Sequence, residues 1–193
     1  MSEITLGIIG GGQLGSMLSI AAKKLNIKTV IFCDDADAPA QNFCNNFIYG
    51  KYDDKNKISE FTNQVNVVTY EFENIPYEAL SEINKLKPVL PKPSVNRLIQ
   101  HRLAEKDFVN KLNIRTTRYA SIEKKSDIDA LVDFLPGILK TTTLGYDGKG
   151  QFPISSSAEL NLIDLDFSRG YVLEKLVKLK KEISIIITRF SNN

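Results

Sequence analysis

The stretch that decides the fold is Ile4-Thr-Leu-Gly-Ile-Ile-Gly-Gly-Gly-Gln-Leu-Gly15, in which a short apolar run, residues 4–9, leads into a glycine-rich turn. A continuous apolar run of this length is typical of a parallel strand that is buried on both faces. After the glycines, apolar residues recur at helical spacing, so that they share one face of a helix. These residues are Leu14, Met17, Leu18, Ala21, Ala22 and Leu25. The stretch therefore predicts the first strand, turn and helix of an open parallel sheet.

Strand and helix patterns alternate as far as the proline-rich segment Pro88-Val-Leu-Pro-Lys-Pro93, which suits an extended linker. We expect strands at 28–32, 47–49 and 65–70, and helices at 55–63 and 77–86. Right-handed crossovers between such strands give an α/β, doubly wound parallel-sheet N-terminal domain, residues 1–94.

A separate α+β unit, residues 95–193, is expected after the linker. Its elements should be helices at 95–112 and 126–134, and strands at 116–121, 137–140, 151–154, 171–174 and 182–189.

Composition excludes several classes of protein. The 25 basic and 23 acidic residues leave a net charge of +2, too small for nucleic-acid binding by bulk charge. No apolar run approaches the ~20 residues of a membrane span. Cys33 and Cys44 do not form a disulfide framework or a zinc knuckle, and His101 is the single histidine. We therefore expect a cytoplasmic protein without nucleic-acid or membrane partners.

The turn from Gly10 to Gly15 fits the G-x-G-x-x-G pattern that brings a phosphate to a helix N-terminus. Asp34 lies about 20 residues further on, where dinucleotide enzymes keep a ribose-binding acid. The pattern alone leaves three alternatives: a dinucleotide site, a mononucleotide phosphate site, or glycines that allow close strand–helix packing without a ligand.

Two acids follow the strand expected at 65–70. Glu71 and Glu73 share one side of an extended segment at the carboxyl edge of the sheet, where ligands bind in open α/β folds. Such carboxylates accept hydrogen bonds from ribose hydroxyls or an amine. The alternative is a solvated strand end before the helix that Pro76 starts.

The most informative loop is Lys140-Thr-Thr-Thr-Leu-Gly-Tyr-Asp-Gly-Lys-Gly-Gln151, where a lysine ends a strand and three glycines with a second lysine follow. A flexible hairpin of this kind can present backbone N–H groups and ammonium charges to a triphosphate. It is not a Walker loop, because no G-K-[ST] leads into a helix. The alternative is a long polar hairpin with glycine turns.

This loop resembles the phosphate-covering loop of ATP-grasp enzymes. Together with the glycine turn and Thr69-Tyr-Glu-Phe-Glu-Asn74, it resembles the 5-(carboxyamino)imidazole ribonucleotide synthase family of de novo purine synthesis, over residues 4–189. The resemblance implies a ligase that uses ATP and Mg²⁺ to carboxylate 5-aminoimidazole ribonucleotide with bicarbonate, through carboxyphosphate, and that is a homodimer when intact. This resemblance requires no dinucleotide, so Asp34 is explained as an acid that starts a turn.

The resemblance also assigns residues to ATP. Lys140 would neutralise phosphate charge, and the forked guanidinium of Arg102 would approach the phosphates. Glu182 would accept both ribose hydroxyls. The loop that would cover the triphosphate comprises Gly145, Tyr146, Asp147, Gly148, Lys149, Gly150 and Gln151. The segment that would pair with the adenine edge comprises Glu174, Lys175, Leu176 and Val177.

On the substrate side, the resemblance places Gly12, Gln13, Leu14 and Glu71 at the aminoimidazole ribonucleotide. Tyr146 and Asp147 are the implied catalytic residues, because they lie where the loop would meet both substrates. Asp147 would orient or deprotonate the attacking amine.

The resemblance places the Mg²⁺ ligands, two Glu and an Asn, in the second half of the ATP-grasp domain, beyond residue 193. We therefore expect no metal ligand in this chain, an incomplete ATP-grasp domain, and no catalysis by the chain alone. Two alternatives remain: another ATP-grasp ligase, such as a formate-using purine transformylase or a biotin carboxylase relative, and a dinucleotide-binding oxidoreductase or non-catalytic binding module.

Overall fold

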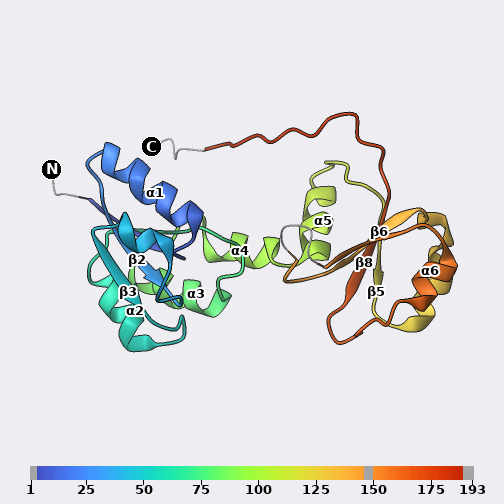
Figure 1. Ribbon diagram of the computed structural model, residues 1–193, viewed down its shortest axis with the longest axis horizontal. Coiled ribbons are helices and arrows are strands. Elements are labelled where there is room, and N and C mark those ends of the chain that lie inside the picture. Colours follow the sequence, from blue (N-terminus) through green and yellow to red (C-terminus); the bar gives the residue numbers. More distant parts are fainter. Residues whose placement is uncertain (1–3, 146–149, 189–193) are drawn as a thin grey trace. The chain divides into compact units, whose positions relative to one another are not determined.

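The computed structural model describes residues 4–145 and 150–188, which fold as two compact units, 1–108 and 109–193 (Figure 1). The change of domain predicted after residue 94 stays a prediction. None of the described helices is long and apolar enough to cross a membrane.

The first unit is built on a four-stranded parallel sheet. Its strands are β1 (Thr5–Ile9), β2 (Lys28–Cys33), β3 (Asn46–Tyr49) and β4 (Val67–Tyr70), in the order β3-β2-β1-β4. This confirms the predicted doubly wound sheet. The strands are connected by α1 (Gln13–Lys24), the 3₁₀ helix η1 (Pro39–Asn42) and α2 (Lys55–Thr62), and α3 (Tyr77–Leu86) follows β4.

Two cores cover the two faces of this sheet. On one face Ile9 and Phe32 pack with Phe61 of α2 and Leu80 of α3. On the other face Ile8 and Ile31 pack with Ala38 and Ala40 around η1. Figure 1 shows α1 and the α2–α3 pair on opposite sides of the strands.

Helix α1 packs on the sheet through its small residues, not through the predicted apolar face. Gly15, Ser16, Ser19 and Ala22 are buried, whereas the large apolar side chains of Leu14, Met17, Leu18 and Leu25 are exposed. A Cβ on Gly15 would lie 2.9 Å from the Gly10 carbonyl oxygen, so the helix starts too close to β1 for a larger residue. The apolar spacing therefore predicted the helix correctly but the buried face wrongly.

The glycine-rich turn is held by Glu71, directly after β4. Its carboxylate accepts hydrogen bonds from the backbone N–H of Gly12, at 2.8 Å, and from that of Gly15, at 3.1 Å. Gly10 has φ of +95°, a conformation that glycine adopts without strain. One negative charge thus satisfies two N–H groups that the start of an α-helix leaves without intrahelical partners.

The helix predicted at 95–112 is two helices, α4 (Pro93–Ile99) and α5 (Arg102–Lys111). The break between α4 and α5 lies where side chains of α4 and of Gln100 form hydrogen bonds with the segment after β4. The side-chain amide of Gln100 donates to the carbonyls of Glu73 and Ile75, at 2.6 and 2.7 Å, and Asn96 also donates to Glu73. The end of α4 is therefore bound to the first unit's sheet edge.

The second unit contains an antiparallel sheet in the order β5-β8-β6-β7, which agrees with the predicted α+β unit. The strands are β5 (Tyr119–Ile122), β6 (Gly137–Thr141), β7 (Gln151–Ile154) and β8 (Tyr171–Lys175). The other elements are the 3₁₀ helix η2 (Lys125–Phe134), where an α-helix was expected, and α6 (Ser157–Leu162). Its core contains Ile122, Leu139, Leu160 and Leu173.

The strand predicted at 182–189 is not formed over the described residues 182–188. Residues 176–188 have no regular structure, and Ile183 and Ile186 are 82% and 94% exposed. A strand gains stability from a neighbour that pairs with its backbone, and the described residues provide none here. The alternating isoleucines are typical of a strand, but this pattern does not show whether a neighbouring strand is present to pair with it.

The turn geometry predicts that Glu71→Ala destabilises the first unit by about 1.5–3 kcal/mol, the value of hydrogen bonds to a charged group. The Gly12 and Gly15 amides should then exchange with solvent faster than in the parent chain. Amide exchange followed by NMR measures this.

The matched control is Glu73→Ala, which removes a carboxylate two residues away and should leave both amides protected. Equal protection of Gly12 and Gly15 in the Glu71→Ala chain would contradict the role given to Glu71.

Candidate functional site

The glycine-rich turn surrounds an internal carboxylate. Added Cβ atoms on Gly10 and Gly12 would lie 2.5 and 2.8 Å from atoms of the Glu71 side chain. Glycine is therefore required at both positions for Glu71 to reach the N-terminus of α1. Of the three alternatives left by the sequence, this geometry disfavours a dinucleotide site, because a pyrophosphate at the turn would meet the negative charge of Glu71.

The predicted substrate residues lie together at the carboxyl edge of the sheet. Gly12 is the N-cap of α1, and the side chains of Gln13 and Leu14 are exposed in its first turn. Glu71 reaches the same turn from the end of β4. The structure thus brings the four residues to one surface that a ligand can reach.

In the second unit, Lys140 at the end of β6 forms an ion pair with Glu174 of β8. The Lys140 Nζ lies 2.9 Å from the Glu174 Oε2, and the two side chains are only 16% and 9% exposed. The strands are neighbours, with Ile138 opposite Glu174 and Lys140 opposite Val172. Since an ammonium has three donors, Lys140 can keep this contact and still donate to a phosphate. Glu174 therefore positions Lys140.

The predicted phosphate loop joins β6 to β7. Lys140 lies opposite Gln151, and the Thr141 N–H donates to the Gly150 carbonyl, at 3.0 Å. Gly150 has φ of +69°, and a Cβ there would lie 2.7 Å from the Thr141 Oγ1. Gly145 also lies within the described chain. The remaining predicted loop residues, Tyr146, Asp147, Gly148 and Lys149, lie outside the described residues.

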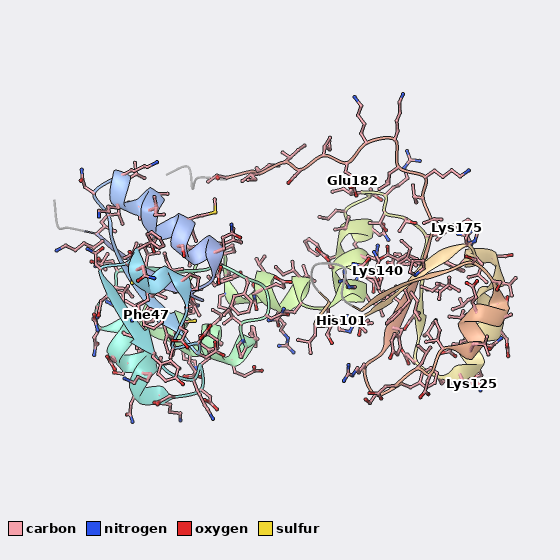
Figure 2. The ribbon with its side chains drawn as sticks, in the orientation of Figure 1. Phe47, His101, Lys125, Lys140, Lys175 and Glu182 are labelled. Carbon is pink, nitrogen blue, oxygen red and sulfur yellow. The ribbon has the colours of Figure 1, made fainter. Side chains whose placement is uncertain are left out.

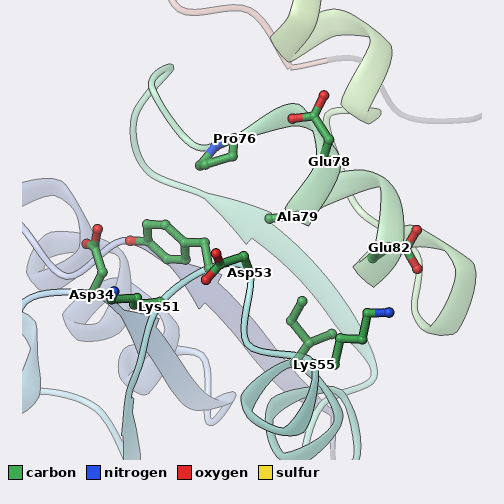
Figure 3. A pocket seen from close by; sticks show the side chains of 10 residues that line it. Asp34, Lys51, Asp53, Lys55, Pro76, Glu78, Ala79 and Glu82 are labelled. Atoms are coloured by element: carbon green, nitrogen blue, oxygen red, sulfur yellow. The ribbon is translucent and has the colours of Figure 1, made fainter.

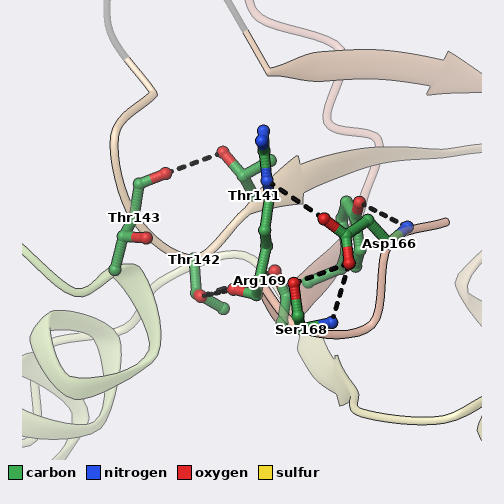
Figure 4. A network of polar contacts seen from close by, with 8 residues as sticks. Thr141, Thr142, Thr143, Asp166, Ser168 and Arg169 are labelled. Atoms are coloured by element: carbon green, nitrogen blue, oxygen red, sulfur yellow. Dashed lines mark hydrogen bonds and ion pairs between the residues drawn. The ribbon is translucent and has the colours of Figure 1, made fainter.

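A polar network that the sequence analysis missed holds the start of this loop (Figure 4). The Thr142 hydroxyl donates to the Arg169 carbonyl, at 2.9 Å, and Arg169 forms an ion pair with Asp166. Ser168 donates to Asp166 through its hydroxyl, at 2.6 Å, and through its N–H, and these bonds hold the pKa of Asp166 below its usual range. The pattern Asp-x-Ser indicates such a side-chain turn and was the available signal.

The segment predicted to pair with adenine is already bonded within the unit. The Lys175 N–H donates to the Arg118 carbonyl and the Leu176 N–H to the Pro136 carbonyl, both at 2.9 Å. The Lys175 ammonium donates to the Asp133 carbonyl, at 2.7 Å. Pairing with an adenine edge through these two N–H groups would break existing bonds. Val177 follows the strand and is half exposed.

Two further predicted ATP residues lie elsewhere in the chain. Glu182 is exposed on the irregular segment 176–188, and Figure 2 shows it well away from Lys140. Arg102 begins α5 in the first unit and is half-buried. The structure therefore brings Lys140, Glu174 and the ends of the loop together, but not Glu182. The described residues contain no group of three or more His, Cys, Asp or Glu side chains that could hold a metal ion.

Comparison with known proteins matches both units. Residues 3–100 match the family model of the ribonucleotide synthetase preATP-grasp domain, and residues 107–193 match that of the ATP-grasp domain.

Among curated relatives, N5-carboxyaminoimidazole ribonucleotide synthase of Staphylococcus aureus (strain COL) is 35% identical over 98% of this chain and 51% of its own. The bifunctional purine synthesis protein purC/E of Dictyostelium discoideum is 36% identical over 96% of this chain and 19% of its own. The chain thus spans about half the length of the bacterial synthase and about a fifth of the bifunctional protein.

Solved structures agree with this match. The Staphylococcus aureus N5-carboxyaminoimidazole synthetase complexed with ADP has a TM-score of 0.83 and 33% identity, over 92% of this chain and 48% of its own. The Aspergillus clavatus N5-carboxyaminoimidazole synthase in complex with ADP and 5-aminoimidazole ribonucleotide has a TM-score of 0.77 and 25% identity, over 92% of this chain and 48% of its own. The match of residues 3–100 to its family model shows that this chain belongs to the ribonucleotide synthetase preATP-grasp family.

Proposed function

We propose that this chain is the N-terminal part of an ATP-dependent ligase that carboxylates 5-aminoimidazole ribonucleotide with bicarbonate, giving N5-carboxyaminoimidazole ribonucleotide. The observation that carries the proposal is the presence in one chain of two features. One is the Glu71-bound turn at the edge of a parallel sheet, and the other is the Lys140–Glu174 pair at the end of β6, where the glycine-rich loop begins. The named relatives match across both features.

ATP is the proposed nucleotide of the second unit. Lys140 is held at a strand end with its charge partly buried, so that it meets a phosphate with little rearrangement. Residues 145–151 would close over the triphosphate, and Arg102 would add a forked donor. Residues 174–177 with Glu182 would bind the nucleoside after the Lys175 and Leu176 N–H groups leave their present carbonyl partners and the segment 176–188 is rearranged. Closure of the loop would exclude water, which would otherwise hydrolyse carboxyphosphate.

Mg²⁺ is proposed as the metal of the reaction, since it neutralises developing phosphate charge. The described residues do not fit such a site, because Glu174 is engaged by Lys140 and no acidic cluster adjoins it. The ligands would come from outside the described residues, and no step is assigned to them in this chain.

The ribonucleotide would bind at the first unit, against Gly12, Gln13, Leu14 and Glu71. Tyr146 and Asp147 are the proposed catalytic residues, and Asp147 would orient or deprotonate the amine that attacks carboxyphosphate. The intact enzyme is proposed to be a cytoplasmic homodimer. Cys33 and Cys44 form no disulfide, which suits a reducing compartment.

For ATP binding, we predict that the double variant Lys140→Met with Glu174→Gln loses about 10- to 100-fold in ATP affinity, because a charge-assisted contact to phosphate is removed. Changing both residues avoids leaving a buried carboxylate unpaired. Calorimetric titration of the chain with ATP measures the loss.

Lys125→Met, which removes an exposed lysine of η2, is the matched control and should bind ATP as the parent does. If the double variant and the control bind ATP equally well, Lys140 is not a phosphate ligand.

For catalysis, we predict that Asp147→Asn in the complete enzyme binds ATP nearly normally but carboxylates the ribonucleotide about 10²- to 10³-fold more slowly. The measurement is ADP release together with product formation. Unchanged turnover would remove Asp147 from the mechanism.

Repeating the ADP-release assay with other amine acceptors, and with formate in place of bicarbonate, separates this ligase from a purine transformylase or a biotin carboxylase relative.

A further inference from the structure

A cavity of about 620 Å³ opens at the carboxyl edge of the parallel sheet, within the first unit (Figure 3). It lies between the segments that follow β2 and β3 and the N-terminal parts of α2 and α3. Figure 3 shows Asp34 and Lys51 on one side of it and Glu78 and Glu82, from α3, on the other. Glu71 does not line it, so this cavity is distinct from the turn proposed to bind the ribonucleotide. Its volume is that of a site for a small molecule.

Asp34 contributes an unused carboxylate to this cavity. Asp34 follows β2 directly, and its side chain is exposed. Its carboxylate has no hydrogen-bond partner among the described residues. The turn-starting role expected for it belongs instead to Asp35, whose Oδ1 accepts the Asp37 N–H at 2.9 Å. A carboxylate at the end of the second strand of such a sheet is placed to accept the two hydroxyls of a ribose.

The floor of the cavity is apolar and partly aromatic. Tyr52 is 7% exposed, and its ring packs edge-on against Phe32 with the centroids 5.4 Å apart. Ile58 and Ala79 are buried beside it. Burial, with Cys33 and Asp34 nearby, raises the pKa of Tyr52, so its ring stays uncharged. A planar, uncharged ring is the kind of group that such a floor accepts.

The charges around the cavity disfavour an anionic ligand. Carboxylates outnumber ammonium groups on its lining, with Asp34, Asp53, Glu78 and Glu82 against two lysines. The contact with Lys85 lowers the pKa of Glu82, which therefore stays ionised. The nearby turn that would take a pyrophosphate is occupied by Glu71. A ligand here should be uncharged and should offer hydroxyl and amino donors.

We propose that this cavity binds an amino-substituted purine nucleoside without phosphate groups. The ribose diol would donate to Asp34, the base would lie on Tyr52, Ile58 and Ala79, and its amino group would donate to Asp53 or Glu78. Nothing in the proposed carboxylation requires this site.

The test is a titration of adenosine into the whole chain, followed by amide NMR. Saturable shifts are expected at residues 34, 51–55 and 77–79. Asp34→Asn should weaken adenosine binding about 10- to 100-fold, the effect of losing hydrogen bonds to a charged group. 2′-Deoxyadenosine should bind the parent chain correspondingly weakly, and NAD⁺ more weakly than adenosine. Asp37→Asn, a neighbouring exposed acid outside the cavity, should bind adenosine as the parent does.

Three results would overturn the proposal: no saturable shifts, shifts confined to residues 137–175, or an unchanged dissociation constant in Asp34→Asn. Tighter binding of NAD⁺ than of adenosine, with shifts at Gly10–Gly15, would also overturn it. ATP binding to the second unit is measured separately, from the amide resonances of residues 137–175. A failure of the proposed ligase function therefore remains distinguishable from a failure of this site.

Discussion

The hydrogen bonds from Gly12 and Gly15 to the Glu71 carboxylate are the constraint on which the first unit depends. They join the end of β4 to the start of α1, although the two segments are far apart in the sequence. They also place a negative charge where a dinucleotide enzyme would place a pyrophosphate. The same three residues thus explain why the turn needs glycine and why the dinucleotide interpretation fails.

The second unit depends on a comparable contact between distant residues. Lys140 and Glu174 lie on neighbouring strands and share a partly buried ion pair, which holds an ammonium group beside the predicted phosphate loop. Such a pair is weak support for stability, because desolvation offsets much of the attraction. Its value is positional, because it holds the Lys140 ammonium in one orientation at the end of β6.

Local patterns in the sequence predicted the elements well. The apolar runs identified all four parallel strands, and the lysine before the glycines identified the β6–β7 hairpin. Predictions were wrong where contacts between distant segments determine which face of a helix is buried or where a helix ends. Apolar spacing could not show that α1 packs through Gly15 and Ser19, leaving Met17 exposed, because that choice depends on how closely the helix approaches β1. Nor could it show the helix break at Gln100, which depends on carbonyls more than twenty residues earlier.

The candidate site was predictable to a similar degree. The residue types and their order indicated Lys140, the loop and Glu71, but not that Glu71 binds backbone N–H groups or that Glu174 binds Lys140. The most direct measurement is a crystal structure of the chain bound to ADP. Phosphate oxygens are expected at Lys140, with Glu71 still bonded to Gly12 and Gly15. A diphosphate seated on the glycine turn, with Glu71 displaced, would contradict it.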